Sequence, residues 1–380
     1  MPEPFVIAVE QADLDELSRR LRATRWPDAA PGSGWAYGTD LEYLQDLCRY
    51  WADDFDWRRA EARLNTYPQF LTEVDGERLH YLHAPSPHPG AVPLLLTHGW
   101  PGSVVEFLHV LGPLVDPPAY GGDAADAFTV VCPSLPGYAW SGPTRQPGWD
   151  IRRVADALAT LMAELGYGRY AAQGGDWGGI ATAHLGVIDA DHLLGIHLNM
   201  ANAPRPPDSA DEVLNRHEQA DLDEMRAFRA DGTGYQAIQG TRPQTLAYGL
   251  TDSPAGLAAW IVEKFRAWSD CGGDVESVFD RDDLLANLTT YWVTGTAGSA
   301  ARLYYETFRS GQPVMPTERV RIPTAVARFP REIYRPPRYW VEAAFNLRRW
   351  TVMPRGGHFA ALEQPDLLVT DIRAFFRDLR

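Results

Sequence analysis

Apolar residues recur every three or four positions through the first part of the chain, with polar residues between them. This spacing places the apolar residues on one face of a helix. It predicts helices over residues 13–22, 41–55 and 57–64. We therefore expect a helical N-terminal arm over residues 1–66, whose apolar face packs against the rest of the protein.

The pattern changes near residue 69. Two short extended stretches flank Asp75-Gly76, a pair typical of a hairpin turn. Continuous apolar runs follow, as in strands buried on both faces of a parallel sheet, at residues 92–97, 128–133, 170–175 and 193–200. Helical patterns lie between several of these runs, and such alternation predicts an α/β fold with a parallel, doubly wound sheet.

The alternation stops after Ala203, and the chain looks mainly helical until strand patterns return at residues 324–329 and 349–353. A final helix is expected over residues 366–379. We therefore expect an α/β core over residues 67–204 and 319–380, interrupted by a helical cap over residues 205–318. An insertion at the carboxyl ends of the strands would roof the cleft there.

Composition narrows the class of protein. The 380 residues are 45% hydrophobic and 22% charged, as in an ordinary globular protein. The net charge of −15 argues against nucleic acid or an anionic membrane surface as partner. No signal peptide or membrane anchor is expected at the start of the sequence, and the three cysteines show no metal or disulfide spacing, so a cytoplasmic location is expected. Every basic residue except Lys264 is arginine, which indicates GC-rich codons and a bacterial source.

The chemistry centres on residues 174–179, Gly-Gly-Asp-Trp-Gly-Gly, between an expected strand and an expected helix. Small residues two before and two after Asp176 have the spacing of a nucleophile elbow. A carboxylate at the elbow can displace a leaving group from a saturated carbon and form an enzyme-bound ester. Asp176 therefore predicts attack on an epoxide or a haloalkane. The alternative is a Gly-rich turn in which an aspartate caps a helix.

Hydrolysis of that ester needs a base, and His358 is the candidate. It lies in Arg-Gly-Gly-His-Phe, directly after the last expected strand. Glu332, just after the strand at residues 324–329, is the candidate acid that orients the histidine. The other usual location for the acid, after residues 193–200, offers no carboxylate.

An oxyanion hole is expected from two backbone N–H groups. One is that of Trp177, directly after the nucleophile, and the other is that of Trp100, in the turn after residues 92–97. Pro101 in the same turn is a candidate for a cis peptide bond.

Four motifs together make the chain resemble an epoxide hydrolase of the α/β-hydrolase superfamily, of the microsomal type with an N-terminal extension. They are Arg-Ala-Thr-Arg-Trp-Pro at residues 22–27, His-Gly-Trp-Pro-Gly-Ser at 98–103, Gly-Gly-Asp-Trp-Gly at 174–178, and Arg-Gly-Gly-His-Phe-Ala-Ala-Leu-Glu at 355–363. The sequence departs from the membrane-bound relatives at its start, where their anchor is expected to be missing, and this departure leads us to expect a soluble enzyme.

The resemblance also implies two cap tyrosines that donate protons to the epoxide oxygen. Tyr235 matches the first and Tyr304 the second, with Tyr305 one position away and Tyr291 a weaker competitor. No cofactor or metal is implied. The expected partners are water and an apolar epoxide, aryl or otherwise bulky, used in making or detoxifying a natural product. A homodimer is left open.

Two other interpretations stay open. A haloalkane-type dehalogenase would share the elbow aspartate, the histidine base and the cap, and it would hold halide with N–H groups in place of phenols. A non-catalytic small-molecule binding protein could keep the same fold, since fold does not fix function. Halide release, or tight binding without turnover, would identify them.

Overall fold

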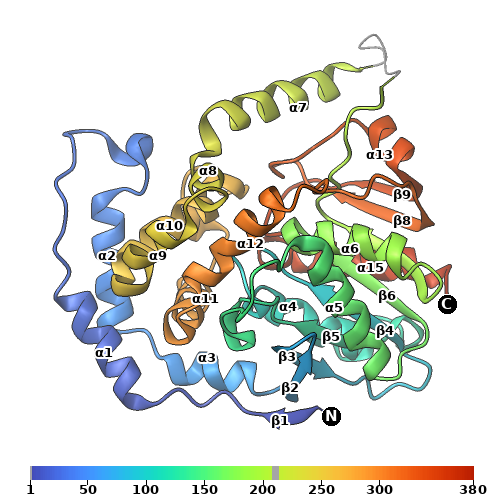
Figure 1. Ribbon diagram of the computed structural model, residues 1–380, viewed down its shortest axis with the longest axis horizontal. Coiled ribbons are helices and arrows are strands. Elements are labelled where there is room, and N and C mark those ends of the chain that lie inside the picture. The colour runs from blue at the N-terminus through green and yellow to red at the C-terminus, as the bar shows by residue number, and fades with distance from the viewer. Residues whose placement is uncertain (1, 208–213) are drawn as a thin grey trace.

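The computed structural model describes residues 2–207 and 214–380, and a nine-stranded sheet forms the centre of this part of the chain (Figure 1). The strand order is β1–β2–β3–β5–β4–β6–β7–β8–β9. The first four strands in this order pair antiparallel, and β5 onward pair parallel. The strands are β1 (Glu3–Phe5), β2 (Gln69–Val74), β3 (Glu77–Ala84), β4 (Val92–Thr97), β5 (Phe128–Pro133), β6 (Tyr170–Gly174), β7 (Leu193–Leu198), β8 (Val320–Arg328) and β9 (Phe345–Val352). The predicted α/β class is confirmed.

Helices cover both faces of the parallel part of the sheet. Alternate residues of β4 point to opposite faces: Leu94 and Leu96 join the apolar cluster under α4 and α15, whereas Leu95 joins the one under α5 and α6. Burial on both faces explains the continuous apolar runs in the sequence. These helices are α4 (Leu108–Val115), α5 (Ile151–Glu164), α6 (Asp176–Ile188) and α15 (Pro365–Arg377). The short helices α13 (Arg338–Ala344) and α14 (Ala360–Glu363) flank β9.

The segment between β7 and β8 is mainly helical where it is described, and Figure 1 shows it beside the sheet; it is the segment expected to form the cap and is called the cap below. Residues 208–213, which fall inside the expected cap segment, lie outside the described residues. Its helices are α7 (Arg216–Ala227), α8 (Gly234–Gln239), α9 (Pro243–Asp252), α10 (Pro254–Trp268), α11 (Arg281–Thr294) and α12 (Ala297–Arg309), with a π-helical turn, Phe228–Gly232, between α7 and α8.

The N-terminal arm joins the cap to the core. Its helices are α1 (Gln11–Arg22), α2 (Leu41–Asp53) and α3 (Trp57–Leu64), and α1 and α2 lie against the cap helices in Figure 1. The indole Nε1 of Trp51 donates to Thr289 Oγ1 of α11 at 2.9 Å, and Arg63 pairs with Asp283 at 2.7 Å. The arm also supplies β1, a three-residue strand at the sheet edge that the sequence did not predict.

The arm is held by burial as well as by polar contacts. Leu47 has no exposed surface, and Leu17, Leu21 and Trp51 are also buried in the cluster that contains cap side chains. Burying one leucine side chain fully stabilises a fold by roughly 1.5–3 kcal/mol. The arm is therefore part of the packed interior. Among the described residues, no helix has the length and apolar character needed to cross a membrane.

Candidate active site

Asp176 is the first residue of α6 and follows β6 after a single glycine, Gly175. Its φ of 50° lies in the left-handed region, which non-glycine residues rarely adopt. A Cβ on Gly174 would lie 2.3 Å from the carbonyl oxygen of Gly178, and one on Gly178 would lie 2.1 Å from that of Thr97. The turn can therefore close only with glycine at both positions, and it presents the Asp176 carboxylate at the carboxyl ends of the strands.

One oxygen of the Asp176 carboxylate accepts a hydrogen bond from a backbone N–H group. The backbone N–H of Trp100 donates to Asp176 Oδ1 at 2.7 Å, and the peptide bond from Trp100 to Pro101 is cis. Trp177 lies in the first turn of α6, where backbone N–H groups have no acceptor within the helix. The positive end of the helix dipole is at this same end. Negative charge on this oxygen is thus met by a donor from a separate loop and by the start of a helix.

His358 lies between Asp176 and a second carboxylate. Its Nδ1 is 2.8 Å from Glu332 Oε1, and its Nε2 is 3.4 Å from Asp176 Oδ2. The His358 and Glu332 side chains are 3% and 2% exposed, so both are shielded from bulk water. The backbone N–H of His358 donates to the carbonyl of Trp268 at 2.9 Å, which fixes the loop after β9 against the cap. With Nδ1–H donating to Glu332, Nε2 faces Asp176 and can exchange a proton there.

The electrostatics of this pair of carboxylates set the charge of the histidine. Burial lowers the pKa of His358, but the charge of Glu332 and the hydrogen bond to Asp176 raise it more, and the net pKa is well above the usual value. His358 is therefore an imidazolium at neutral pH. Esterification of Asp176 would remove one of the two anions, and the pKa of His358 would then fall.

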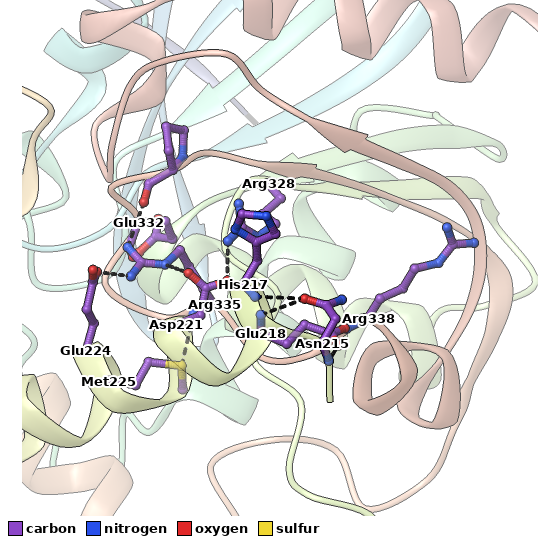
Figure 2. Close-up of polar contacts among 11 residues, drawn as sticks. Asn215, His217, Glu218, Asp221, Glu224, Met225, Arg328, Glu332, Arg335 and Arg338 are labelled. Atoms are coloured by element: carbon purple, nitrogen blue, oxygen red, sulfur yellow. Dashed lines mark hydrogen bonds and ion pairs between the residues drawn. The ribbon is translucent and has the colours of Figure 1, made fainter. Parts of the chain in front are cut away.

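The loop that carries Glu332 is tied to the cap by ion pairs (Figure 2). The Oε1 atom of Glu332 accepts from the backbone N–H of Ile333 at 2.6 Å. The backbone carbonyl of Glu332 accepts from the Arg335 guanidinium at 2.8 Å. The guanidinium of Arg335 also pairs with Asp221 and Glu224 of α7. Its side chain is 6% exposed, so the pairing is shielded from water. Helix α7 thus helps to fix the carboxylate that orients His358.

Tyr235 of α8 and Tyr304 of α12 pack against each other and against the tryptophans beside Asp176. Tyr235 stacks on Trp100, with ring centroids 5.0 Å apart and 7° between the planes. Tyr304 meets Trp177 edge-on at 4.8 Å, and the two tyrosine rings are 5.9 Å apart. Both tyrosines are buried, whereas Tyr305 is 38% exposed. The two rings therefore cover the two residues whose backbone flanks the Asp176 carboxylate.

Both phenols are neutral at physiological pH. Burial raises the pKa of Tyr235, and the charge of Asp176 raises it further. Burial likewise raises the pKa of Tyr304 well above its usual value, with Tyr235 and Asp176 contributing. Tyr291, the weaker competitor, donates its hydroxyl proton to the Gly102 carbonyl at 2.8 Å and so supports the oxyanion turn. Tyr235 and Tyr304 both lie close enough to Asp176 for its charge to raise their pKa values.

The sequence did not single out two side chains that belong to this site. Glu106 lies just beyond the oxyanion turn and lines a small cavity together with Asp176 and His358. Arg335 holds the Glu332 loop and finds its partners more than 100 positions away. A short helical turn and a lone arginine carry no periodic signal, so the positions of Glu106 and Arg335 emerge only from the folded chain.

Two known family models match the chain. The family model described as "Epoxide hydrolase N terminus" matches residues 2–107, and the model described as "alpha/beta hydrolase fold" matches residues 92–254. The first match spans the arm and continues through the oxyanion turn. The second includes the elbow and the start of the cap.

Individual relatives cover nearly the whole chain. A protein of Stigmatella aurantiaca, whose name assigns it provisionally to the epoxide hydrolases, is 48% identical over 99% of this chain and 85% of its own. Epoxide hydrolase 1 of Oryctolagus cuniculus is 35% identical over 98% of this chain and 88% of its own. The solved structure of the Aspergillus niger epoxide hydrolase superposes with a TM-score of 0.89 at 33% identity, covering 100% of this chain and 97% of that one.

Proposed function

The chain belongs to the epoxide hydrolase family of the α/β-hydrolase fold, and we propose that it converts an apolar epoxide to a vicinal diol through an ester on Asp176. One observation carries this proposal. The same carboxylate receives the Trp100 N–H on Oδ1 at 2.7 Å and faces the His358 base through Oδ2 at 3.4 Å. Such a carboxylate has one oxygen free to attack and one oxygen placed to become an oxyanion.

In the first step, the hydroxyls of Tyr235 and Tyr304 donate hydrogen bonds to the epoxide oxygen. Asp176 Oδ2 attacks a ring carbon, the bond between that carbon and the ring oxygen breaks, and the oxygen takes a proton from a phenol. Neutral phenols suit this role because the leaving oxygen is a strong base. The products of this step are an alkyl ester on Asp176 and one tyrosinate.

In the second step, His358 acts as a general base. The ester carries no charge, so the pKa of His358 falls, the imidazolium gives its proton to the tyrosinate, and the neutral ring can then accept a proton from water. The water oxygen attacks Cγ of Asp176, and the N–H groups of Trp100 and Trp177 stabilise the oxyanion. The ester bond to the product then breaks, and the product oxygen takes the proton of the new Asp176 carboxylic acid. The diol leaves, with Asp176 again a carboxylate and His358 again an imidazolium. Glu332 keeps the imidazole oriented throughout.

The walls of the site support an apolar substrate, aryl or otherwise bulky. Trp100, Trp268 and Tyr304 contact Tyr235 through their rings, and Phe308 adds a ring against Trp177. Such a lining favours apolar ligands, with the few polar groups fixing their orientation. The arginine-rich composition points to a GC-rich bacterium, where such an enzyme would make or detoxify an epoxide-bearing natural product.

The test is product analysis with styrene oxide, a bulkier aryl epoxide and a haloalkane. We expect diols from the epoxides and no halide release, with both diols lost in Asp176→Ala. Asp252→Ala, which changes a largely exposed aspartate of the cap, is the matched control and should keep full activity. Halide release without diol would identify a dehalogenase instead.

A single turnover in H₂¹⁸O tests the ester itself. The first diol should carry an unlabelled oxygen taken from Asp176, and the label should remain in the enzyme. Label in that first diol would mean direct attack by water and would refute the ester route. The Asp176 peptide, analysed by mass spectrometry after turnover, should have gained the label.

A further inference from the structure

Glu106 carries a carboxyl group beside the nucleophile, and none of the described residues forms a hydrogen bond with it. It lies on the 3-10 helix Val104–Phe107, directly after the oxyanion turn, and it is partly buried. Within the described part of the chain, no hydrogen bond or ion pair reaches its carboxyl group. Polar groups enclosed in a protein are nearly always hydrogen-bonded to protein or to ordered water. The carboxyl of Glu106 therefore needs a partner from solution.

A cavity beside Glu106 has the size for that partner. Its volume is about 20 Å³, whereas one water molecule needs roughly 10–15 Å³. Asp176 and His358 are among the residues that line it. Thr97 lines it as well, and its Oγ1 is buried with no hydrogen-bond partner among the described residues. A buried water is stable with two to four polar partners, and this lining supplies them.

The carboxyl of Glu106 is held there by the shape of the turn. A Cβ built on Gly102 would lie 1.3 Å from Glu106 Oε1 and 2.3 Å from its Cδ. The side chain thus folds back over the turn that supplies the Trp100 N–H. Glycine at this position leaves room for the carboxyl next to the groups that act on the ester.

The charge state of Glu106 fits this position. Burial raises the pKa of Glu106 to about 8; His358 works against the increase, and Asp176 adds to it. Cys132 and Tyr291 also interact electrostatically with Glu106, and both are neutral because burial raises their pKa values. Glu106 is therefore mainly protonated at pH 7 and does not repel the Asp176 anion. Its carbonyl oxygen can accept a hydrogen bond in either protonation state.

We propose that Glu106 is a positioning residue that holds the hydrolytic water in this cavity. The proposal rests on the ester route proposed above. One O–H of the water donates to the Glu106 carboxyl and the other to His358 Nε2, which directs the oxygen lone pair at Cγ of Asp176. His358 takes one proton as the O–C bond forms, and Glu106 keeps its own protonation state. A reactant held in line in this way reacts faster by orders of magnitude than one free to reorient.

The experiment separates the two half-reactions with styrene oxide by rapid quenching and mass spectrometry of the Asp176 peptide. We expect Glu106→Leu to form the ester at the wild-type rate and to hydrolyse it about 10²-fold more slowly, so that the ester accumulates. Glu106→Gln keeps a carbonyl acceptor of the same length and should stay within about tenfold of wild type. A structural role alone would slow both steps together. Wild-type hydrolysis in Glu106→Leu, or equal loss in both variants, would overturn the proposal.

Two further variants keep the test decisive. Gly102→Ala displaces the Glu106 carboxyl from the cavity without changing Glu106 itself, and it should also slow ester hydrolysis. It replaces Glu106→Leu if that variant does not fold, as judged by circular dichroism, and unchanged hydrolysis in it would then count against the proposal. His358→Gln should trap the ester. If neither it nor wild type forms an ester on Asp176, the proposed function fails; if the ester forms and Glu106 variants hydrolyse it normally, only this inference fails.

Discussion

Replacing Glu332 by glutamine should shift the pH dependence of ester hydrolysis toward acid. Glu332 Oε1 accepts from His358 Nδ1 at 2.8 Å, and once Asp176 is esterified it is the anion left against the ring. A hydrogen bond to a charged group contributes about 1.5–3 kcal/mol, and one pH unit corresponds to about 1.4 kcal/mol. The pKa of His358 in the ester state should therefore fall by about one to two pH units in Glu332→Gln.

The sign follows from the role of the base. Since only neutral His358 accepts a proton, hydrolysis in wild type fails as the pH drops through the pKa of the ester state. In Glu332→Gln this loss should move to lower pH. At pH values above this pKa, hydrolysis in Glu332→Gln should be slower than in wild type by about 10- to 100-fold. The hydrogen bond to the Glu332 carboxylate then no longer stabilises the imidazolium that forms in the transition state. Esterification by Asp176 should change much less.

Single-turnover rates of ester hydrolysis, measured between pH 5 and pH 9 with styrene oxide, provide the assay. Glu342→Gln is the matched control, because the Glu342 carboxylate pairs with Arg338 on the surface of α13 and is 47% exposed. Its profile should coincide with that of wild type. An acid limb that stays in place in Glu332→Gln would refute the reasoning, since His358 would then owe its basicity to other groups.

Three further predictions follow from contacts described above or from the buried core. Tyr304→Phe should slow esterification by about 10- to 100-fold, as expected for loss of a hydrogen bond to a developing charge, and leave ester hydrolysis unchanged, whereas Tyr305→Phe should keep wild-type rates of both steps. Asp371→Asn should lower the free energy of unfolding in urea by roughly 3–5 kcal/mol, because the Asp371 side chain is 2% exposed and accepts from a histidine, an arginine and a threonine. Those contacts lower the pKa of Asp371 to about 2, from an ordinary value of 3.8, so the stabilisation is present above pH 3.8 and is lost as the pH falls toward 2. Equal acid sensitivity of wild type and variant would contradict this prediction. Gly178→Ala should abolish diol formation and destabilise the fold by about 1–3 kcal/mol or more, whereas Gly249→Ala, where a Cβ meets no atom within 4 Å, should be neutral or slightly stabilising in thermal unfolding.

The strands that could be predicted were those buried on both faces. An uninterrupted apolar run such as residues 92–97 has few other uses in a globular protein, and it became β4. β1 could not be found in this way, because three residues with a proline at the centre carry no period. Its place is decided by pairing with β2, 66 positions away. The start of β9 was also not predicted, because polar residues interrupt its apolar pattern. The strand begins at Phe345, ahead of the expected residue 349.

The parts of the site that could be proposed from sequence are those where backbone shape demands particular residues. The elbow around Asp176 and the glycine turn before His358 are such places, because a strained or closely packed backbone restricts the residues it accepts. Glu106 is different. Nothing in the local sequence distinguishes it from a solvated glutamate, and its importance comes from the space that Gly102 leaves and from the distant residues that close the cavity.

The contacts between the arm and the cap have a consequence for how the chain is made. Trp51 hydrogen-bonds to Thr289, 238 positions later, and synthesis at about 5–20 residues per second separates the two by roughly 12 to 48 s. The helices that leave the ribosome first are therefore among the last to find their partners. Through that interval the apolar faces of α1 and α2 stay open to water and to other nascent chains, so this stretch is where we expect a chaperone to bind during synthesis.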